Sequence, residues 1–203
     1  QTFSSQQQSL TSSEAPFSLG LRKYMRLTNT SAVNTGAELV QMYTNLEGQD
    51  IAGSGWDYTS SSSYLTFSFW VRSSLAGTYY VRFQTTPASG TNRQYSVPFT
   101  LSADTWTKVT KTIPGNSSLE IDDDNEGRFS VFVVAHYGTN YTDPTANDGE
   151  WRLYPDNTAL VGTDFAQNFK NTNNATFDVT GVQLEVGSVA TPFEHRSYGE
   201  ELA

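Results

Sequence analysis

The sequence predicts an all-β protein, a two-sheet antiparallel jelly-roll β-sandwich. Eight segments carry the two-residue alternation, or the β-branched and aromatic residues, that are typical of strands. Turn-forming residues separate these segments at a spacing of about ten residues, as in sandwiches and barrels. No segment has the apolar periodicity of an amphipathic helix of about ten residues or more. Strands of this length joined by long loops favour a jelly roll.

The first four predicted strands are mixed or alternating segments, at 19–29, 37–46, 64–74 and 78–86. The third is the strongest, because its apolar residues recur at every second position and so share one face. These residues are Leu65, Phe67, Phe69 and Val71. Ala76 and Gly77 then punctuate the chain, so we expect the third and fourth strands to form a β-hairpin.

The remaining predicted strands are apolar or alternating segments, at 93–101, 105–115, 127–137 and 175–187. Pro98 has no backbone N–H group, which places its strand at a sheet edge or a bulge. Gly181 permits a bulge in the last strand. The irregular region 138–174 is expected to contain one helical turn, around 164–169.

The domain organisation follows from the change in composition near Phe17. Residues 1–16 are polar, rich in Gln and Ser and without periodicity, so we expect a polar linker or N-terminal arm. The jelly-roll domain then covers 17–203. Its end, 187–203, is expected to form a latch, with Phe193 as an apolar plug.

Composition excludes several classes of function. The net charge of -9 disfavours nucleic acid, because binding its backbone requires clustered Lys and Arg. No apolar run approaches the roughly 20 residues of a bilayer span, so membrane insertion is not expected. The absence of cysteine excludes disulfides, cysteine metal sites and cysteine nucleophiles.

Catalytic motifs are also missing from the sequence. His195 lies near Glu194 and Glu200, but Pro192 breaks any helix that could align them, so we interpret this histidine as a tail contact. No nucleophile elbow, paired-histidine zinc motif or phosphate-binding loop occurs. The sequence therefore predicts that the chain is not an enzyme. A glycosidase whose paired carboxylates come from the two acidic loops, 121–127 and 142–151, remains an alternative, with Asp148 and Glu150 as the carboxylates to test.

An acidic run is the candidate metal site. Its carboxylates supply the hard oxygen ligands that calcium prefers, although their spacing is not that of a known calcium loop. They are Asp122, Asp123, Asp124 and Glu126. The alternative is a solvated turn between two strands. No other cofactor is expected beyond this structural calcium.

Aromatic and amide residues of the loops are the candidate ligand site. A flat ring can stack on the apolar face of a sugar, while amides bind its hydroxyl groups. The candidates are Trp56, Tyr58, Tyr137, Asn140, Tyr141, Trp151 and Tyr154. The alternative is that these rings cover the ends of the sheets or lie in a subunit interface.

Three stretches, at 64–84, 93–115 and 179–203, resemble the carbohydrate-binding-module-like jelly-roll domain of tailed-phage structural proteins. The resemblance extends over 17–203, and its most specific part is the run Thr180-Gly181-Val182-Gln183-Leu184-Glu185. Such domains occur in tail fibres, receptor-binding proteins, and head fibres or capsid decorations. The resemblance supports the fold more than any particular ligand.

The resemblance implies a non-enzymatic virion structural protein at the surface of the phage particle. It implies a homotrimer that contacts other virion proteins and displays loops toward a host-surface polysaccharide. Two alternatives stay open at this point. One is a head fibre or capsid decoration protein with no glycan role, and the other is a carbohydrate-binding module of a secreted enzyme.

Overall fold

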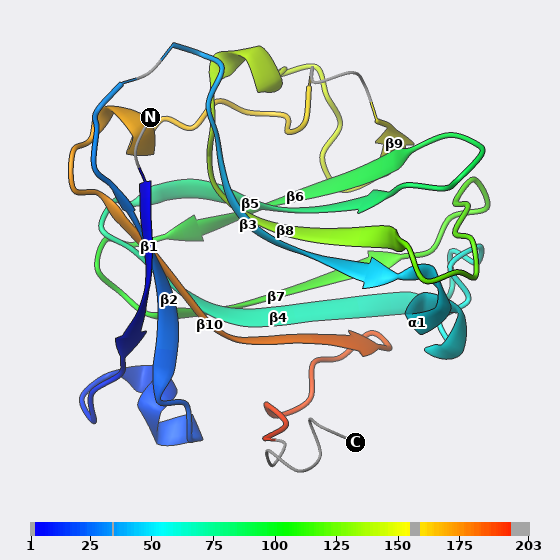
Figure 1. The fold of residues 1–203 in the computed structure, drawn as a ribbon, viewed down its shortest axis with the longest axis horizontal. Coiled ribbons are helices and arrows are strands. Elements are labelled where there is room, and N and C mark those ends of the chain that lie inside the picture. The colour runs from blue at the N-terminus through cyan, green and yellow to red at the C-terminus, as the bar shows by residue number, and fades with distance from the viewer. Residues whose placement is uncertain (1–2, 34, 155–158, 196–203) are drawn as a thin grey trace.

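The computed structural model of the chain describes residues 3–33, 35–154 and 159–195. Two five-stranded sheets pack face to face (Figure 1). Sheet A contains, in spatial order, β1 (Phe3–Ser9), β2 (Lys23–Asn29), β10 (Thr176–Val186), β4 (Tyr64–Ser73) and β7 (Thr107–Pro114). Sheet B contains β3 (Leu39–Glu47), β8 (Gly127–Tyr137), β5 (Gly77–Thr85), β6 (Arg93–Leu101) and β9 (Trp151–Leu153). These strands pair antiparallel, which confirms the predicted jelly-roll β-sandwich.

The core lies between the two sheets and follows the two-residue alternation of the strands. Phe67 and Phe69 of β4 are buried, as predicted, and they meet aromatic rings of sheet B. The ring centroids of Phe67 and Phe83 are 6.0 Å apart, and those of Phe69 and Phe99 are 5.7 Å apart. Each such side chain stabilises the fold by about 1.5–3 kcal/mol relative to an exposed one. The apolar faces of the strands therefore hold the two sheets together.

The predicted hairpin between β4 and β5 is wrong, because these two strands lie in different sheets. β4 pairs with β10 and β7, whereas β5 pairs with β6 and β8. Each strand has one strongly apolar face, and the turn at 74–76 turns those faces toward each other across the core. Ser73 and Tyr79 clasp this turn through a hydroxyl–hydroxyl hydrogen bond of 2.7 Å.

Ordered structure begins earlier than expected, because β1 lies inside the predicted polar arm 1–16. All seven of its residues pair in register with β2, from Phe3 opposite Asn29 to Ser9 opposite Lys23. Edge pairing of this kind uses backbone groups, so it needs no apolar alternation in the sequence. β1 forms one edge of sheet A.

The predictions for Pro98 and Gly181 are confirmed. Pro98 lies opposite Tyr80 of β5, and β9 pairs only with 93–95, so the other side of β6 is a free edge at the proline. Gly181 has a φ of +58° and lies in the bulge between Thr180 and Gln183.

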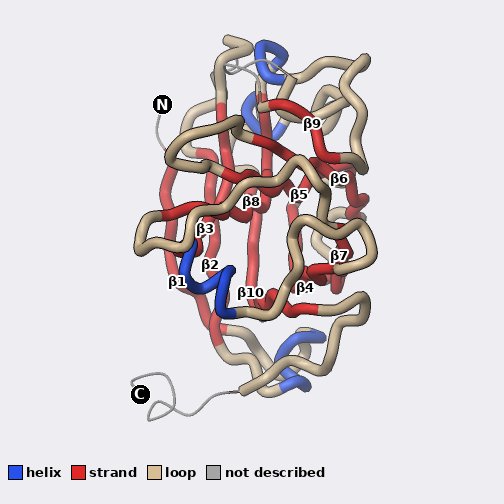
Figure 2. Tube along the Cα trace, turned by 90° about the vertical axis from the view of Figure 1, so that its right-hand side faces the viewer, coloured by secondary structure: helices blue, strands red, loops and turns tan. Residues whose placement is uncertain are grey.

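In the described residues, short helices lie in the connections between strands and are blue in Figure 2: η1 (Ala15–Leu19), α1 (Gly48–Gly53), η2 (Thr139–Tyr141) and η3 (Phe169–Asn171). The helical turn expected around 164–169 occurs slightly later, as η3. α1 begins where the N–H groups of Gly48 and Gln49 donate to the carbonyls of Glu126 and Asp124, at 3.0 and 2.8 Å. In the described ranges, none of the helices is long and apolar enough to cross a membrane.

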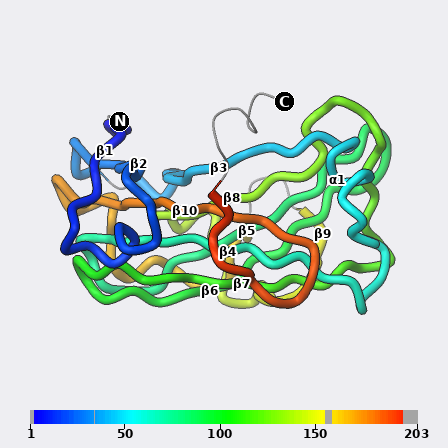
Figure 3. Tube along the Cα trace, turned by 90° about the horizontal axis from the view of Figure 1, so that it is seen from below, coloured from blue at the N-terminus to red at the C-terminus, as the bar shows by residue number. Residues whose placement is uncertain are grey.

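The described part of the predicted latch, 187–195, crosses the outer face of sheet A, where Figure 3 shows it in orange and red. The carbonyl of Gly187 accepts a hydrogen bond from Thr66 at 2.7 Å, and the N–H of Glu194 donates to Gln183 at 2.9 Å. A ring nitrogen of His195 lies 2.5 Å from the carbonyl oxygen of Leu19. These contacts are made within one chain. The rest of the predicted latch, 196–203, lies outside the described residues.

Candidate functional site

The carboxylates of the acidic run do not converge as a calcium site requires. Asp124 accepts hydrogen bonds from Arg128, at 2.9 Å from Nε to Oδ1 and 2.5 Å from Nη2 to Oδ2. These bonds lower the pKa of Asp124 below its ordinary value. Asp122 accepts the backbone N–H of Ala88 at 2.7 Å.

Asp123 and Glu126 complete the predicted set, but the described residues contain no group of three or more His, Cys, Asp or Glu side chains that could hold a metal ion. The expectation of convergent calcium ligands is therefore corrected. In this structure the acidic run is a turn organised by Arg128.

The two loop carboxylates of the glycosidase alternative, Asp148 and Glu150, each accept hydrogen bonds from nearby groups of the protein. Asp148 Oδ1 accepts the hydroxyl of Ser96 at 2.5 Å and the N–H of Gly162 at 3.1 Å. Glu150 accepts the side-chain amide of Asn147 at 2.5 Å. The bond to Ser96 holds the loop that contains Asp148 against β6, and the bond between Asn147 and Glu150 lies within this loop.

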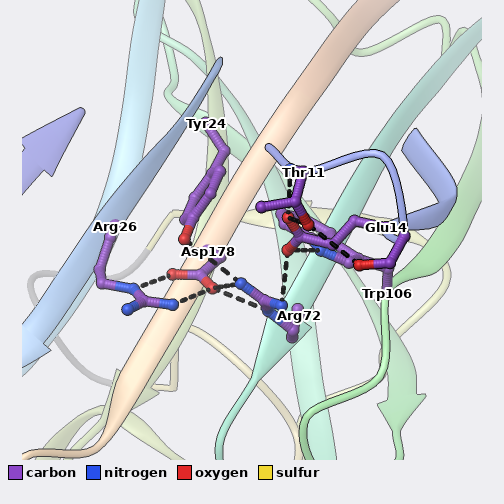
Figure 4. A network of polar contacts seen from close by, with 8 residues as sticks. Thr11, Glu14, Tyr24, Arg26, Arg72, Trp106 and Asp178 are labelled. Atoms are coloured by element: carbon purple, nitrogen blue, oxygen red, sulfur yellow. Dashed lines mark hydrogen bonds and ion pairs between the residues drawn. The ribbon is translucent and has the colours of Figure 1, made fainter. Parts of the chain in front are cut away.

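A polar network on the outer face of sheet A joins two carboxylates to two arginines (Figure 4). Arg26 Nε and Arg72 Nε donate to the two oxygens of Asp178, at 2.7 and 2.9 Å. The Asp178 side chain is 0% exposed. Arg72 Nη1 and Trp106 Nε1 both donate to Glu14 Oε1, at 2.8 and 2.9 Å.

The charges of this network are balanced within the chain, which makes it a structural clasp. Burial raises the pKa of Glu14, but hydrogen bonds from Trp106 and Thr11 outweigh it and hold the pKa below its ordinary value. An ionised carboxylate that accepts hydrogen bonds from four donor groups is poorly suited to transfer a proton. The clasp fastens β2, β10 and β4 to the segment that leads into η1.

Three of the predicted ligand aromatics pack against the main core instead of facing solvent. Trp56 is only 4% exposed, and its ring centroid lies 5.5 Å from that of Phe129. Tyr58 is half-buried beside it. Trp151 donates its indole N–H to the carbonyl of Pro114 at 2.7 Å. The expected exposure of Trp56 is corrected, because apolar rings at strand ends close the core.

The other four predicted ligand residues lie on or beside the outer face of sheet B, and the structure brings three of them into one small aromatic cluster. Tyr137 is 1% exposed, while Tyr141 and Tyr154 are half-buried and pack against the same cluster. Asn140 is exposed beside them in η2. Tyr137 is therefore a buried residue, and its expected exposure is corrected. The cluster anchors the loop after β8 onto the outer face of sheet B.

An aromatic row crosses this outer face and contains a residue that was not predicted. Tyr43 of β3 lies opposite Phe132 of β8, which lies opposite Arg82 of β5. The rings of Tyr43 and Phe132 stack with centroids 5.6 Å apart and planes 23° apart. The guanidinium of Arg82 lies 3.9 Å from the centroid of the Phe132 ring. Tyr43 is 62% exposed, so the row ends in an open tyrosine ring.

A polar row runs parallel to the aromatic row and is offset from it by two residues along each strand. Its members are Asn45, Ser130, Gln84, Gln94 and Arg152, which are cross-strand neighbours from β3 to β9. Ser130 donates to the side-chain oxygen of Asn45 at 2.7 Å, and Arg82 donates to that of Gln84 at 2.7 Å. Asn45 is exposed and Gln84 is half-buried, so this end of the polar row faces solvent.

The two rows together form the candidate functional site. Arg82 Nε donates to the hydroxyl of Tyr137 at 3.3 Å, and that hydroxyl donates to the side chain of Gln41. Burial raises the pKa of Tyr137, which keeps the hydroxyl protonated. An exposed ring with amide and hydroxyl groups beside it can bind a polyhydroxylated ligand.

The sequence contains a signal for Tyr43 that differs from that of the loop aromatics, because Tyr43 lies within a strand. In the segment 39–47, polar residues and one tyrosine alternate with apolar ones, so Gln41, Tyr43 and Asn45 share the outer face. An aromatic ring on the solvent-facing side of a strand therefore indicates a binding site, just as an aromatic ring in a loop does.

Comparisons with known proteins extend only to solved structures, since no protein-family model and no curated protein matches the chain. The chain is similar to a structure described as "CBM4 structure and function", at 14% identity and a TM-score of 0.39, over 81% of this chain and 71% of the other. It is similar to "Family 16 Carbohydrate Binding Module-2", at 14% identity and a TM-score of 0.38, over 81% and 77%. It is also similar to the enzymatically active domain of tailspike protein 4 of bacteriophage CBA120, at 8% identity and a TM-score of 0.43, over 91% of this chain and 19% of the other. At these TM-scores, nothing about the ligand of this chain follows.

Proposed function

We propose that this chain is a non-enzymatic, glycan-binding domain of a tailed-phage virion protein, and that it binds saccharide on the outer face of sheet B. The observation that carries the proposal is the open ring of Tyr43, backed by Phe132 and flanked by Asn45. Support for the virion setting comes from the sequence resemblance of 64–84, 93–115 and 179–203 to phage structural domains.

The physical reason lies in how Tyr43 is held. Stacking on Phe132 fixes the ring before any ligand arrives, so little side-chain entropy is lost on binding. The free face of the ring can then cover the C–H face of a sugar, while the amides of Asn45 and Gln84 bind hydroxyl groups. Since Tyr43 lies on a strand of the sandwich, its position is rigid.

The test compares two tyrosines on a glycan array and by calorimetry. Tyr43→Ala is expected to weaken saccharide binding by about tenfold or more, equal to about 1.4 kcal/mol. Tyr64→Ala is the matched control, because Tyr64 is also an exposed strand tyrosine but lies in sheet A. Equal affinity of the two variants would contradict the proposed site.

The proposed assembly is a homotrimer on the surface of the particle, in contact with other virion proteins. Exposed apolar side chains such as Met25 and Val182 support contact between copies. Light scattering should give three chain masses, and immunogold labelling should mark the particle. A trimer that binds no saccharide would favour a head fibre or capsid decoration, and a monomer that binds one would favour a module of a secreted enzyme.

A further inference from the structure

The arginines of this chain differ in how their charge is balanced. Arg26 and Arg72 contact Asp178, and Arg128 contacts Asp124, each within 3 Å. Arg82 is at least as buried as these, at 3% exposed, yet no carboxylate of the described residues lies within the 4.0 Å of an ion pair. A buried cation without an anionic partner is unfavourable, so Arg82 is a candidate for a role in binding.

The guanidinium of Arg82 is rigidly placed by neutral groups. Nε donates to Tyr137 at 3.3 Å, Nη1 donates to Gln84 at 2.7 Å, and the planar group lies over Phe132. Nη2 makes no hydrogen bond within the described part of the chain, so its two N–H groups are left for another acceptor. Gln84, which accepts the hydrogen bond from Nη1, is partly exposed.

Asp148 is an acidic group at the other end of the polar row, where it is linked to Arg152 through Ser96. Asp148 Oδ1 accepts the hydroxyl of Ser96 at 2.5 Å, and Arg152 Nη2 donates to that hydroxyl at 3.2 Å. Burial lowers the pKa of Arg152, Asp148 opposes this effect, and the positive charge of Arg82 adds to it. Arg82 and Arg152 thus repel each other, and the carboxylates that act on Arg152, namely Asp148, Glu150 and Asp143, form no ion pair with Arg82 among the described residues.

We infer that the saccharide bound at this face is acidic, and that Arg82 binds its carboxylate. This inference rests on the proposed function. A hexuronic acid unit carries a carboxylate on a pyranose ring. Its carboxylate can bind Arg82 while its own ring, or the ring of an adjacent sugar unit, stacks on Tyr43. Arginine suits this task because its planar group matches a carboxylate with two parallel hydrogen bonds.

The test uses the full chain and pairs of ligands that differ in one group. Each uronic-acid oligosaccharide is compared with the same oligosaccharide after chemical reduction of its carboxyl groups, by calorimetry at low and high salt. The wild type should bind at least one acidic member about tenfold more tightly than its reduced form. That preference should shrink at high salt.

Variants then assign the preference to one residue. Arg82→Met keeps an apolar stem on Phe132 and should remove the preference, whereas Arg82→Lys should keep part of it. Arg22→Met is the matched control, since the Arg22 guanidinium also lies 3.9 Å over a phenylalanine ring, that of Phe17, but on the far side of the domain. Circular dichroism confirms that each variant is folded.

The outcomes separate this inference from the proposed function. Saccharide binding that Tyr43→Ala weakens, but that shows no preference for the acidic member or keeps the preference in Arg82→Met, would overturn the role of Arg82 and leave the proposed function standing. Preference for sulfated over carboxylated oligosaccharides would overturn the carboxylate assignment. Binding of no saccharide in either series would overturn both.

Discussion

Arg72 and Asp178 face each other across the β4–β10 pair, with Nε 2.9 Å from Oδ2 and the carboxylate fully buried. Arg82 is buried on the outer face of the other sheet without such a partner among the described residues. Within the described residues, one molecule thus contains an arginine that forms an ion pair and a buried arginine that forms none. We therefore expect substitution of the first residue pair to lower stability and substitution of Arg82 to change binding, and both effects can be measured.

The first prediction concerns the clasp. Asp178→Asn should lower the free energy of unfolding by about 3 kcal/mol, because it removes the ion pair of Arg26 and leaves Arg72 paired with Glu14 alone. Urea denaturation followed by tryptophan fluorescence measures this. A loss below about 1 kcal/mol would mean that the clasp contributes no more than an exposed ion pair.

The second prediction is the opposite behaviour of Arg82. Arg82→Met should leave the free energy of unfolding unchanged within about 1 kcal/mol, or raise it, because a buried charge without a partner is removed while the stem still packs on Phe132. The same urea experiment serves, with Asp178→Asn run in parallel. A loss as large as that of the clasp variant would show that Arg82 has a structural role.

The third prediction concerns pH and His136. Its side chain is 2% exposed, both ring nitrogens lack hydrogen-bond partners within the described residues, and burial lowers its pKa to about 4. Lys170 lowers this pKa further, and Glu38 opposes the shift.

The sign follows from which state binds the proton. Between pH 6.5 and about 4 the unfolded chain holds a proton on His136 that the folded chain does not, so stability is present above pH 6.5 and is lost as the pH falls. From pH 7.5 to 5.5 the loss should be about 1 kcal/mol.

His136→Phe should remove that part of the pH dependence. The carboxylates with lowered pKa, such as Glu14 and Asp143, lose their contribution only at lower pH, so this window isolates the histidine. An unchanged slope in the variant would exclude His136 as its source.

The fourth prediction concerns chelation. Because Asp124 is bound to Arg128, we expect EDTA to leave the Tm unchanged. Calorimetric scans with EDTA and with excess calcium measure this. A Tm that falls by several degrees with EDTA and recovers with calcium would restore the acidic run as a calcium site.

Much of the fold could be predicted, because the alternation of apolar and polar residues that marks a strand is a property of the local sequence. The bounds 93–101 and 127–137 agree with β6 and β8, and the bulge at Gly181 needed only a glycine in a strand. Strand partners could not be predicted in the same way. Whether β4 pairs with β5 or faces it across the core is decided by tertiary packing, and the pairing of β1 uses backbone groups that every residue has.

The candidate site could be predicted only in part. Tyr137, Tyr141 and Tyr154 do gather on one face, but as packing residues. The ring with the open face is Tyr43, whose exposure depends on tertiary packing that no local pattern states. Trp56 was predicted to bind ligand but is buried, because no local sequence pattern indicates whether an aromatic side chain of a loop points into the core.

The measurement that tests the central claim most directly is NMR shift mapping with a saccharide selected on the array. The ring signals of Tyr43 and the side-chain amide signals of Asn45 and Gln84 should shift together and saturate, while the ring signals of Tyr64 stay in place. Shifts confined to sheet A, or no shift at any saccharide concentration, would contradict binding on the outer face of sheet B.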